Sequence, residues 1–284
     1  MQKIIALDNL RVDCNIGRLT IQNITISSKP GEHTIVIVDA WPDSDKTGYV
    51  SSNLSGQPMS VRVNEDEILF YGVIYEVTER WEAGFLSLRI IARSLSWLLD
   101  LEKKSRSFQK TESQHTEIIA NILDEYGAYA ISNFKDRQID TPYIQYNETD
   151  WEFIRRITSR LGVHVIPSDR QEYPGLYIGF PDRQKTEPID NAIYRFGIDD
   201  EFIRKRSGNK SQYIYYDVED YSPRQLGDAV VFQGAELSVC EINARLDRGV
   251  LRFAYRLAGT LYNKVQPEYN SSIRGLSLTG TVLA

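Results

Sequence analysis

Residues 145–166 read QYNETDWEFIRRITSRLGVHVI, and several independent signals in this stretch predict the same local structure. Thr149 and Glu152 have the spacing of a capping box, in which each side chain accepts a hydrogen bond from the other residue's backbone N–H at the positive end of the helix. Gly162 stands where a left-handed helix C-cap is needed, and the apolar residues after it end at Pro167. The stretch therefore predicts a strand, a capped helix, a glycine and a second strand.

The helix predicted after Thr149 has an apolar and a polar face. Its apolar positions are Trp151, Phe153, Ile154, Ile157 and Leu161, and its polar positions are Glu152, Arg155, Arg156, Ser159 and Arg160. Helical spacing places the first set against the core and the second toward solvent. Glu152 and Arg156 are expected to pair across one turn. For the three arginines, a solvated face and a docking face for an acidic neighbour remain alternatives.

The same stretch resembles a family motif. Its residues are Gln145, Tyr146, Asn147, Glu148, Asp150, Trp151, Phe153 and, after the helix, Gly162. The pattern is similar to one found in the hub proteins of contractile injection machines: myophage baseplate hubs, late-control tail proteins and the VgrG spikes of type VI secretion. The resemblance implies that these residues are structural, and that the chain carries two β-barrel hub domains around a smaller α+β module.

Composition bounds the function. The 284 residues suffice for two or three domains, and the net charge of -6 comes without a basic block, which argues against nucleic-acid binding as the main role. Cys14 and Cys240 lie far apart and predict two small buried thiols in a reducing compartment. No apolar run reaches membrane-spanning length and no secretion signal is evident, so we expect the protein to stay cytoplasmic until it is assembled.

Periodicity along the chain predicts an α+β fold that is mainly β. Residues 1–100 read as short strands, with a bulge near Gln22 and a hairpin joined by residues 81–84, and are expected to form the first barrel. Residues 101–190 hold the α+β module, whose first helix is expected at 117–126 with Ser113 or Thr116 as its cap. Residues 191–273 return to strands, expected at 202–206, 212–218, 229–232, 237–246 and 250–257, and form the second expected barrel.

Two further stretches resemble the hub family. The turn at 225–228 is similar to one in the second barrel of the family, although Leu226 stands where the family usually has proline. Residues 274–284 resemble the connection to, or the first strand of, an oligonucleotide-fold spike barrel.

Catalytic chemistry finds little support in the sequence. The three histidines, His33, His115 and His164, lack the spacing of metal ligands on one element. The acidic groups at 199–201 and 217–220 are interpreted as solvated turns, because neighbouring carboxylates in a turn point in different directions. Neither a phosphate-binding loop nor a nucleophile motif is present. We therefore expect no catalytic residue, no cofactor and no metal.

Two functions of different class remain. The resemblance implies a structural hub that joins a hexameric tail tube to a trimeric spike. It would be a homotrimer whose six barrels match the tube, with the tube protein, the spike or tip protein and other baseplate proteins as partners. The alternative is a cell-wall carbohydrate-active enzyme or carbohydrate-binding β-domain protein of a tail. The sequence does not distinguish a phage tail, a tailocin and a secretion apparatus.

Overall fold

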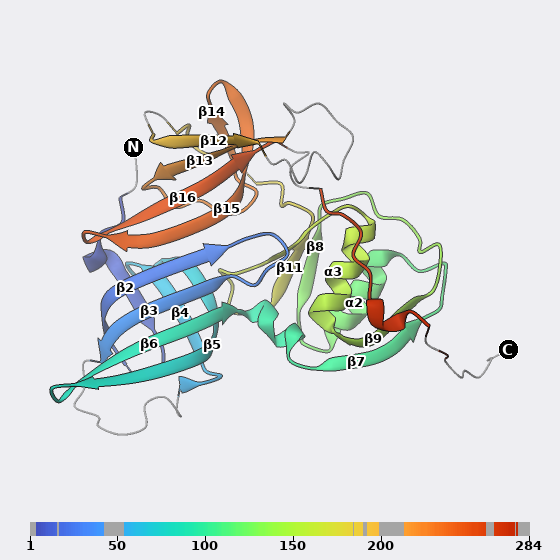
Figure 1. Ribbon diagram of the computed structural model, residues 1–284, viewed down its shortest axis with the longest axis horizontal. Helices are drawn as coiled ribbons and strands as arrows, with labels where there is room; N and C mark the ends of the chain where they lie inside the picture. The colour runs from blue at the N-terminus through green and yellow to red at the C-terminus, as the bar shows by residue number, and fades with distance from the viewer. Residues whose placement is uncertain are drawn as a thin grey trace.

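The computed structural model describes residues 4–15, 17–42, 54–183, 185–189, 192–198, 213–259, 264–275 and 277. Figure 1 shows a large β-sheet on one side and a smaller module with helices on the other. A C-terminal segment crosses from the sheet to the module. The fold is mainly β with a minority of helix, as the sequence predicted.

The large sheet combines strands from both ends of the chain. Its N-terminal strands are β1 (Leu10–Asp13), β2 (Leu19–Ser28), β3 (Ile35–Pro42), β4 (Pro58–Val63), β5 (Glu67–Glu82) and β6 (Phe85–Ser94). Its C-terminal strands are β12 (Tyr194–Ile198), β13 (Ile214–Asp220), β14 (Ala229–Phe232), β15 (Ala235–Asp247) and β16 (Val250–Ala258). The strand order is β1-β4-β5-β6-β3-β2-β15-β16-β13-β12, with β14 beside β15. Antiparallel pairing of β2 with β15, from Thr25↔Arg245 to Ser28↔Ile242, joins the two groups.

Closed barrels are not seen among the described residues. The hydrogen-bonded path starts at β1 and ends at β12, and β1 pairs with β4 alone. The edge of β2 that could have received β1 is used by β15 at its C-terminal half. One sheet therefore runs through both β-rich segments. Their apolar side chains share one buried cluster, which includes Ile24, Val38 and Phe70 from the first group and Val218 and Tyr255 from the second.

Local signals in the sequence set the bulge and the tight hairpin. The register of β2 against β3 shifts around Gln22, which confirms the predicted bulge. β5 and β6 are joined by Ala83 and Gly84 alone, a shorter turn than the predicted 81–84, because β5 extends to Glu82. Both turn residues have positive φ (50° and 86°), the backbone of two-residue turns that fit the twist of paired strands.

The helical module lies between the two groups of strands in the sequence. Its elements are the 3-10 helix η2 (Leu95–Asp100), β7 (Lys103–Phe108), α2 (His115–Asp124), β8 (Tyr129–Ser132), β9 (Tyr143–Thr149), α3 (Asp150–Arg160), β10 (Val165–Pro167) and β11 (Gly175–Ile178). The strands form a sheet in the order β10-β11-β8 and a separate β7-β9 pair. A second buried cluster, which includes Ile119, Ile122, Phe153, Ile157 and Leu176, holds helices and strands together.

Helix α2 is capped from a distance. It begins at His115, slightly earlier than predicted, and its N-cap residue Gln114 makes no side-chain capping bond. The backbone N–H of Thr116 donates instead to the carboxylate of Asp136, at 3.1 Å. The predicted caps, Ser113 and Thr116, are therefore wrong, because a carboxylate from a later loop satisfies this helix end.

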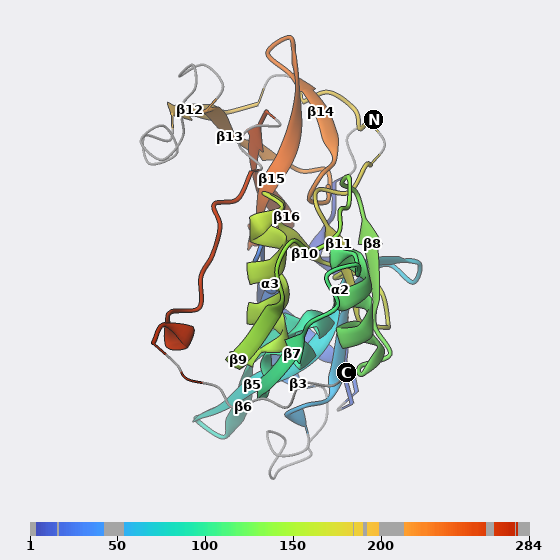
Figure 2. The ribbon, with the colours of Figure 1, turned by 90° about the vertical axis from the view of Figure 1, so that its right-hand side faces the viewer.

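The C-terminal strap, residues 264–275, fastens the end of the described chain to the module. Figure 2 shows it descending beside α3. The N–H of Val265 donates to the carbonyl of Gly162 at 3.3 Å, and Nδ2 of Asn270 donates to the carbonyl of Tyr146 at 2.8 Å. The 3-10 helix η4 (Ser271–Ile273) follows. The strand expected at 202–206 and nearly all of the spike strand expected at 274–284 lie outside the described residues.

Candidate functional site: the motif and the junction it builds

The motif residues lie on β9, at the start of α3 and at Gly162, which follows the C-cap residue of α3. Gln145, Glu148, Asp150, Trp151 and Phe153 are buried. Tyr146 is half-buried, and Asn147 is exposed with φ of 49°. Gly162 has φ of 72°, which confirms the predicted left-handed cap. The fold therefore gathers five of the eight motif side chains at the corner where β9 turns into α3.

The predicted capping box is present. The N–H of Thr149 donates to Oε2 of Glu152 at 2.9 Å, and the N–H of Glu152 donates to Oγ1 of Thr149 at 3.1 Å. The Thr149 hydroxyl also donates to Oδ1 of Asp100, at 2.5 Å. Because Asp100 lies in η2, the cap also attaches α3 to the segment that leaves the large sheet.

Asp150 is a buried carboxylate that joins four elements. It accepts hydrogen bonds from Lys104 Nζ at 2.9 Å and from Gln145 Nε2 at 2.9 Å. The Tyr126 hydroxyl donates at 2.7 Å, and the Arg106 guanidinium also donates. Burial alone would raise the pKa of this carboxyl, yet the donors hold the pKa below its usual value. The ionised group therefore ties β7, β9 and the end of α2 to the first turn of α3.

Two side chains predicted to face solvent are buried. Arg156 is 5% exposed and pairs with Glu148, to which its Nε and Nη2 donate at 2.7 and 2.8 Å. Its Nη2 also donates to the carbonyl of Ile144 at 2.6 Å. The predicted pair with Glu152 is wrong because the Glu152 carboxylate is engaged in the cap. Ser159 is buried as well, and its hydroxyl donates to the carbonyl of Arg156 at 2.7 Å.

His33 connects the large sheet to the module. Its ring packs against Trp151 at a tilt of 35°, with centroids 4.3 Å apart, and meets Trp97 edge-on at 5.4 Å. Its Nδ1 lies 2.8 Å from Oγ of Ser96, and its Nε2 lies 3.3 Å from Oδ2 of Asp100. Burial lowers the pKa of His33, so the ring is neutral at pH 7.

Ser96, His33 and Asp100 have the connectivity of a hydrolytic triad, which the sequence analysis missed. A catalytic serine must reach its substrate. Here Ser96 is 1% exposed, its hydroxyl also bonds Ser94 at 2.9 Å, and two tryptophan rings contact the imidazole. The trio therefore acts as a polar link between sheet and module. Ser96 and Asp100 lie 63 and 67 residues after His33, so no local sequence pattern could have revealed the link.

The acidic residues at 217–220 lie on a strand. They were predicted as solvated turns, but they belong to β13 and are ion-paired, and the strand register places Arg256 directly opposite Asp217. The pairs are Asp217 with Arg256 at 2.8 Å, Glu219 with Arg252 at 3.3 Å and Asp220 with Arg224 at 3.0 Å. These carboxylates are engaged in structural ion pairs. The acidic group at 199–201 lies outside the described residues.

Cys14 and Cys240 are not joined in a disulfide. Cys240 is buried, and burial raises its pKa to about 12. Cys14 is half-buried, so the prediction of burial holds for Cys240 alone. Within the ranges that the structure describes, no three His, Cys, Asp or Glu side chains gather as a metal site would require. No helix of the same ranges has the length and apolar character needed to cross a membrane.

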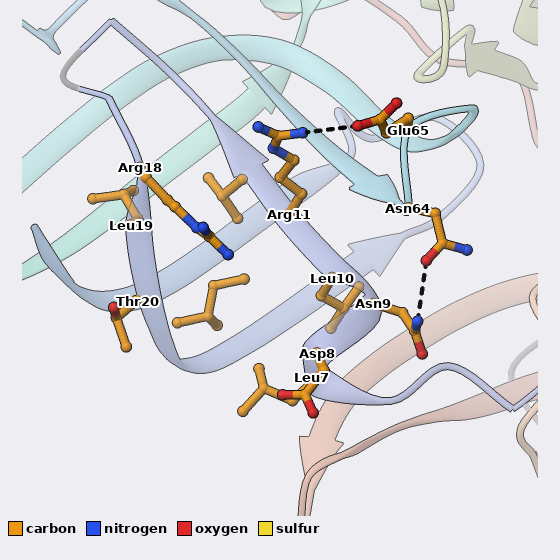
Figure 3. Close-up of a pocket in the computed structure, with 12 residues that line it drawn as sticks. Leu7, Asp8, Asn9, Leu10, Arg11, Arg18, Leu19, Thr20, Asn64 and Glu65 are labelled. Atoms are coloured by element: carbon orange, nitrogen blue, oxygen red, sulfur yellow. Dashed lines mark hydrogen bonds and ion pairs between the residues drawn. The ribbon is translucent and has the colours of Figure 1, made fainter. Parts of the chain in front are cut away.

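A groove of about 550 Å³ lies between β1 and β2 (Figure 3). It is lined by the 3-10 helix η1 (Leu7–Asn9), by β1, by the start of β2 and by the β4–β5 turn. On its rim Asn9 Nδ2 donates to Asn64 Oδ1 at 3.0 Å, and Arg11 lies 3.9 Å from Glu65. The charged residues among its lining are Asp8, Arg11, Arg18 and Glu65, and the groove follows the seam between β1 and β2.

Residues 25–173 match the family model of the phage tail baseplate hub (GPD), which covers more than half of the chain. The chain belongs to this family. It is a structural tail protein of the baseplate hub class, a component of a phage tail or a related injection apparatus. No curated protein matches the sequence.

Solved structures with very different sequences share the fold. The c3393 protein of E. coli, described as a component of the type VI secretion system similar to the T4 tail proteins gp27 and gp5, aligns with a TM-score of 0.72 at 10% identity, over 91% of this chain and 79% of that one. The 43 kDa tail protein of prophage MuSo2 from Shewanella oneidensis aligns with a TM-score of 0.70 at 12% identity, over 92% of this chain and 99% of that one. A chain of the lidded Francisella PdpA–VgrG complex aligns with a TM-score of 0.57 at 8% identity, over 92% of this chain and 53% of that one.

Proposed function

We propose that the chain forms a homotrimeric hub that joins a hexameric tail tube to a trimeric spike. The observation that carries this proposal is the β2–β15 pairing, which sets the two β-rich segments side by side in one sheet. Three copies around an axis would present six such segments, which would match sixfold symmetry on one side and threefold on the other. The tube protein, a spike or tip protein and other baseplate proteins are the proposed partners, and the chain stays in the cytoplasm until they assemble.

The proposed division of the chain follows the same logic. Residues 1–100 and 191–273 are the two hub units, and residues 101–190 are the module that braces them. The module reaches the first unit through His33 and the second through the C-terminal strap. Residues 274–284 are the proposed connection to the spike, and η4, which ends at Ile273 just before them, contacts β9.

Two strand edges of the large sheet supply surfaces for assembly. One is β12, which ends the strand order, and the other is the part of β5 beyond Ile74. In the part of the chain that is described, β12 pairs with β13 alone and presents Ile193, Tyr194, Phe196 and Ile198, each at least 40% exposed. Beyond Ile74, β5 has β6 as its one described strand partner, and Trp81 near its tip is exposed. Strand edges with exposed apolar side chains tend to pair with other chains. A contact between these two different edges is heterologous, and such a contact forms a ring when the rotation between successive copies closes.

Light scattering over a concentration series tests the proposal. The chain should form a trimer as concentration rises. Phe196→Asp should weaken that trimer because it places a charge at the β12 edge, whereas Tyr173→Asp, at an equally exposed aromatic in the β10–β11 loop, should not. A stable dimer with twofold symmetry would be incompatible with a ring of six units.

A further inference from the structure

Arg93, near the end of β6, is held against two aromatic rings. Its guanidinium carbon lies 4.1 Å from the ring centroid of Tyr75 and 4.0 Å from that of Trp97. The two rings stand almost perpendicular, at 87°. Cations bind favourably to aromatic faces, and the contact fixes the plane of the guanidinium. We call Arg93, Tyr75 and Trp97 the arginine corner.

The charge of Arg93 has no ion-pair partner in the described part of the chain, and its Nε is buried without a hydrogen-bond acceptor. Asp100, on the 3-10 helix that follows, directs its oxygens to His33 and Thr149, although the nearby Arg93 charge is among the causes that lower the pKa of Asp100. Arg89, four residues earlier on β6, is by contrast paired with Asp39 at 3.1 Å. Arg93 as a whole is half-buried, so part of the residue remains open to a partner although its Nε is covered.

The corner lies where β5 has β6 as its one strand partner among the described residues. The register of β5 against β6 shifts between Ile74 and Glu76, which makes Tyr75 the bulge residue, and bulges redirect side chains. Ile74 still bonds the loop before β4, since its N–H donates to the carbonyl of Gln57 at 2.9 Å. Tyr75 is 43% exposed. A chain that pairs with the β5 edge would therefore pass next to the arginine corner.

We infer that the arginine corner binds a carboxylate of a second copy of the chain in the assembled hub, an inference that rests on the proposed function. Arginine, tyrosine and tryptophan dominate the energies of protein interfaces, and a guanidinium can bind a carboxylate through two parallel hydrogen bonds. The sequence holds 39 acidic and 33 basic residues, so a second copy offers an excess of carboxylates. Nucleic acid fits the corner less well, because phosphate binding uses several clustered cations and the corner supplies one.

The test compares self-association of full-length variants by sedimentation velocity at low and high salt. Arg93→Gln should weaken association on the order of 30-fold, the effect of losing an interface hot spot. Arg93→Lys should weaken it to a smaller extent, because lysine keeps the charge but lacks the planar fork. Arg89→Gln is the matched control and should leave association unchanged. Association of the wild type should weaken with salt more steeply than that of Arg93→Gln.

Each outcome decides between the inferences. Wild-type affinity in Arg93→Gln would overturn the arginine corner while leaving the trimeric hub intact. Failure of the wild type to assemble at all would overturn the hub and the corner together. If Arg93→Gln does not unfold cooperatively on heating, it is not a folded control, and Arg93→Lys is used instead. Self-association of Arg93→Lys with the affinity of the wild type would then refute the inference.

Discussion

Replacing Asp150 with asparagine should destabilise the fold by about 3 kcal/mol. The carboxylate is fully buried and accepts hydrogen bonds from two cations, a tyrosine and a glutamine. Removing one partner of a buried charge pair costs about 3–5 kcal/mol. The lower end applies here because the side chains of Lys104 and Arg106 are 23% and 24% exposed and keep Glu125 as a partner.

Urea unfolding followed by tryptophan fluorescence measures this loss at pH 7. Glu102→Gln, at an exposed site, is the control and should change the free energy of unfolding by less than about 0.5 kcal/mol. The folded-state pKa of Asp150 lies below 3.8, so its contribution is complete above that pH and disappears as the pH falls through the folded-state pKa. The difference in unfolding free energy between the wild type and Asp150→Asn should therefore disappear at acidic pH. A loss below about 1 kcal/mol at pH 7 would refute the role of this carboxylate as the link between β7, β9 and α3.

Three further changes test the junction. Thr149→Ala removes the cap of α3 and should cost about 1 kcal/mol of unfolding free energy in the same assay. Trp151→Ala removes a buried ring that packs against His33 and should cost about 3 kcal/mol, so a silent change would place that ring outside the core. Because the folded-state pKa of His33 is lowered by burial, stability should be complete above pH 6.5 and fall below it. His33→Gln, which does not titrate, should lose less stability between pH 6.5 and 5, and parallel curves would contradict the assignment.

Local chemistry explains which parts of the site could be predicted. The capping box needs residues three apart and no tertiary contact, so Thr149 and Glu152 could be assigned from the sequence. The burial of Arg156 could not be predicted. A periodic pattern places it on a polar face but does not show that Glu148 pairs with it there. The link of His33 to Ser96 and Asp100 has no local signal at all, since its members meet through tertiary packing.

The strands and their edges show the same division. Alternation and turn residues located the β5–β6 hairpin and the bulge in β2 within a few residues. The same patterns could not show that β2 pairs with β15, because periodicity identifies a strand but does not choose its neighbour. That pairing replaces the expected separate barrels with one sheet, and it sets the two β-rich segments in the arrangement on which the hub proposal depends.

Electron microscopy of the assembled chain tests the central proposal most directly. Views down the symmetry axis should show a threefold ring in which each copy contributes two similar β units, six around the axis. A twofold dimer, or particles that remain single copies at every concentration, would contradict the hub.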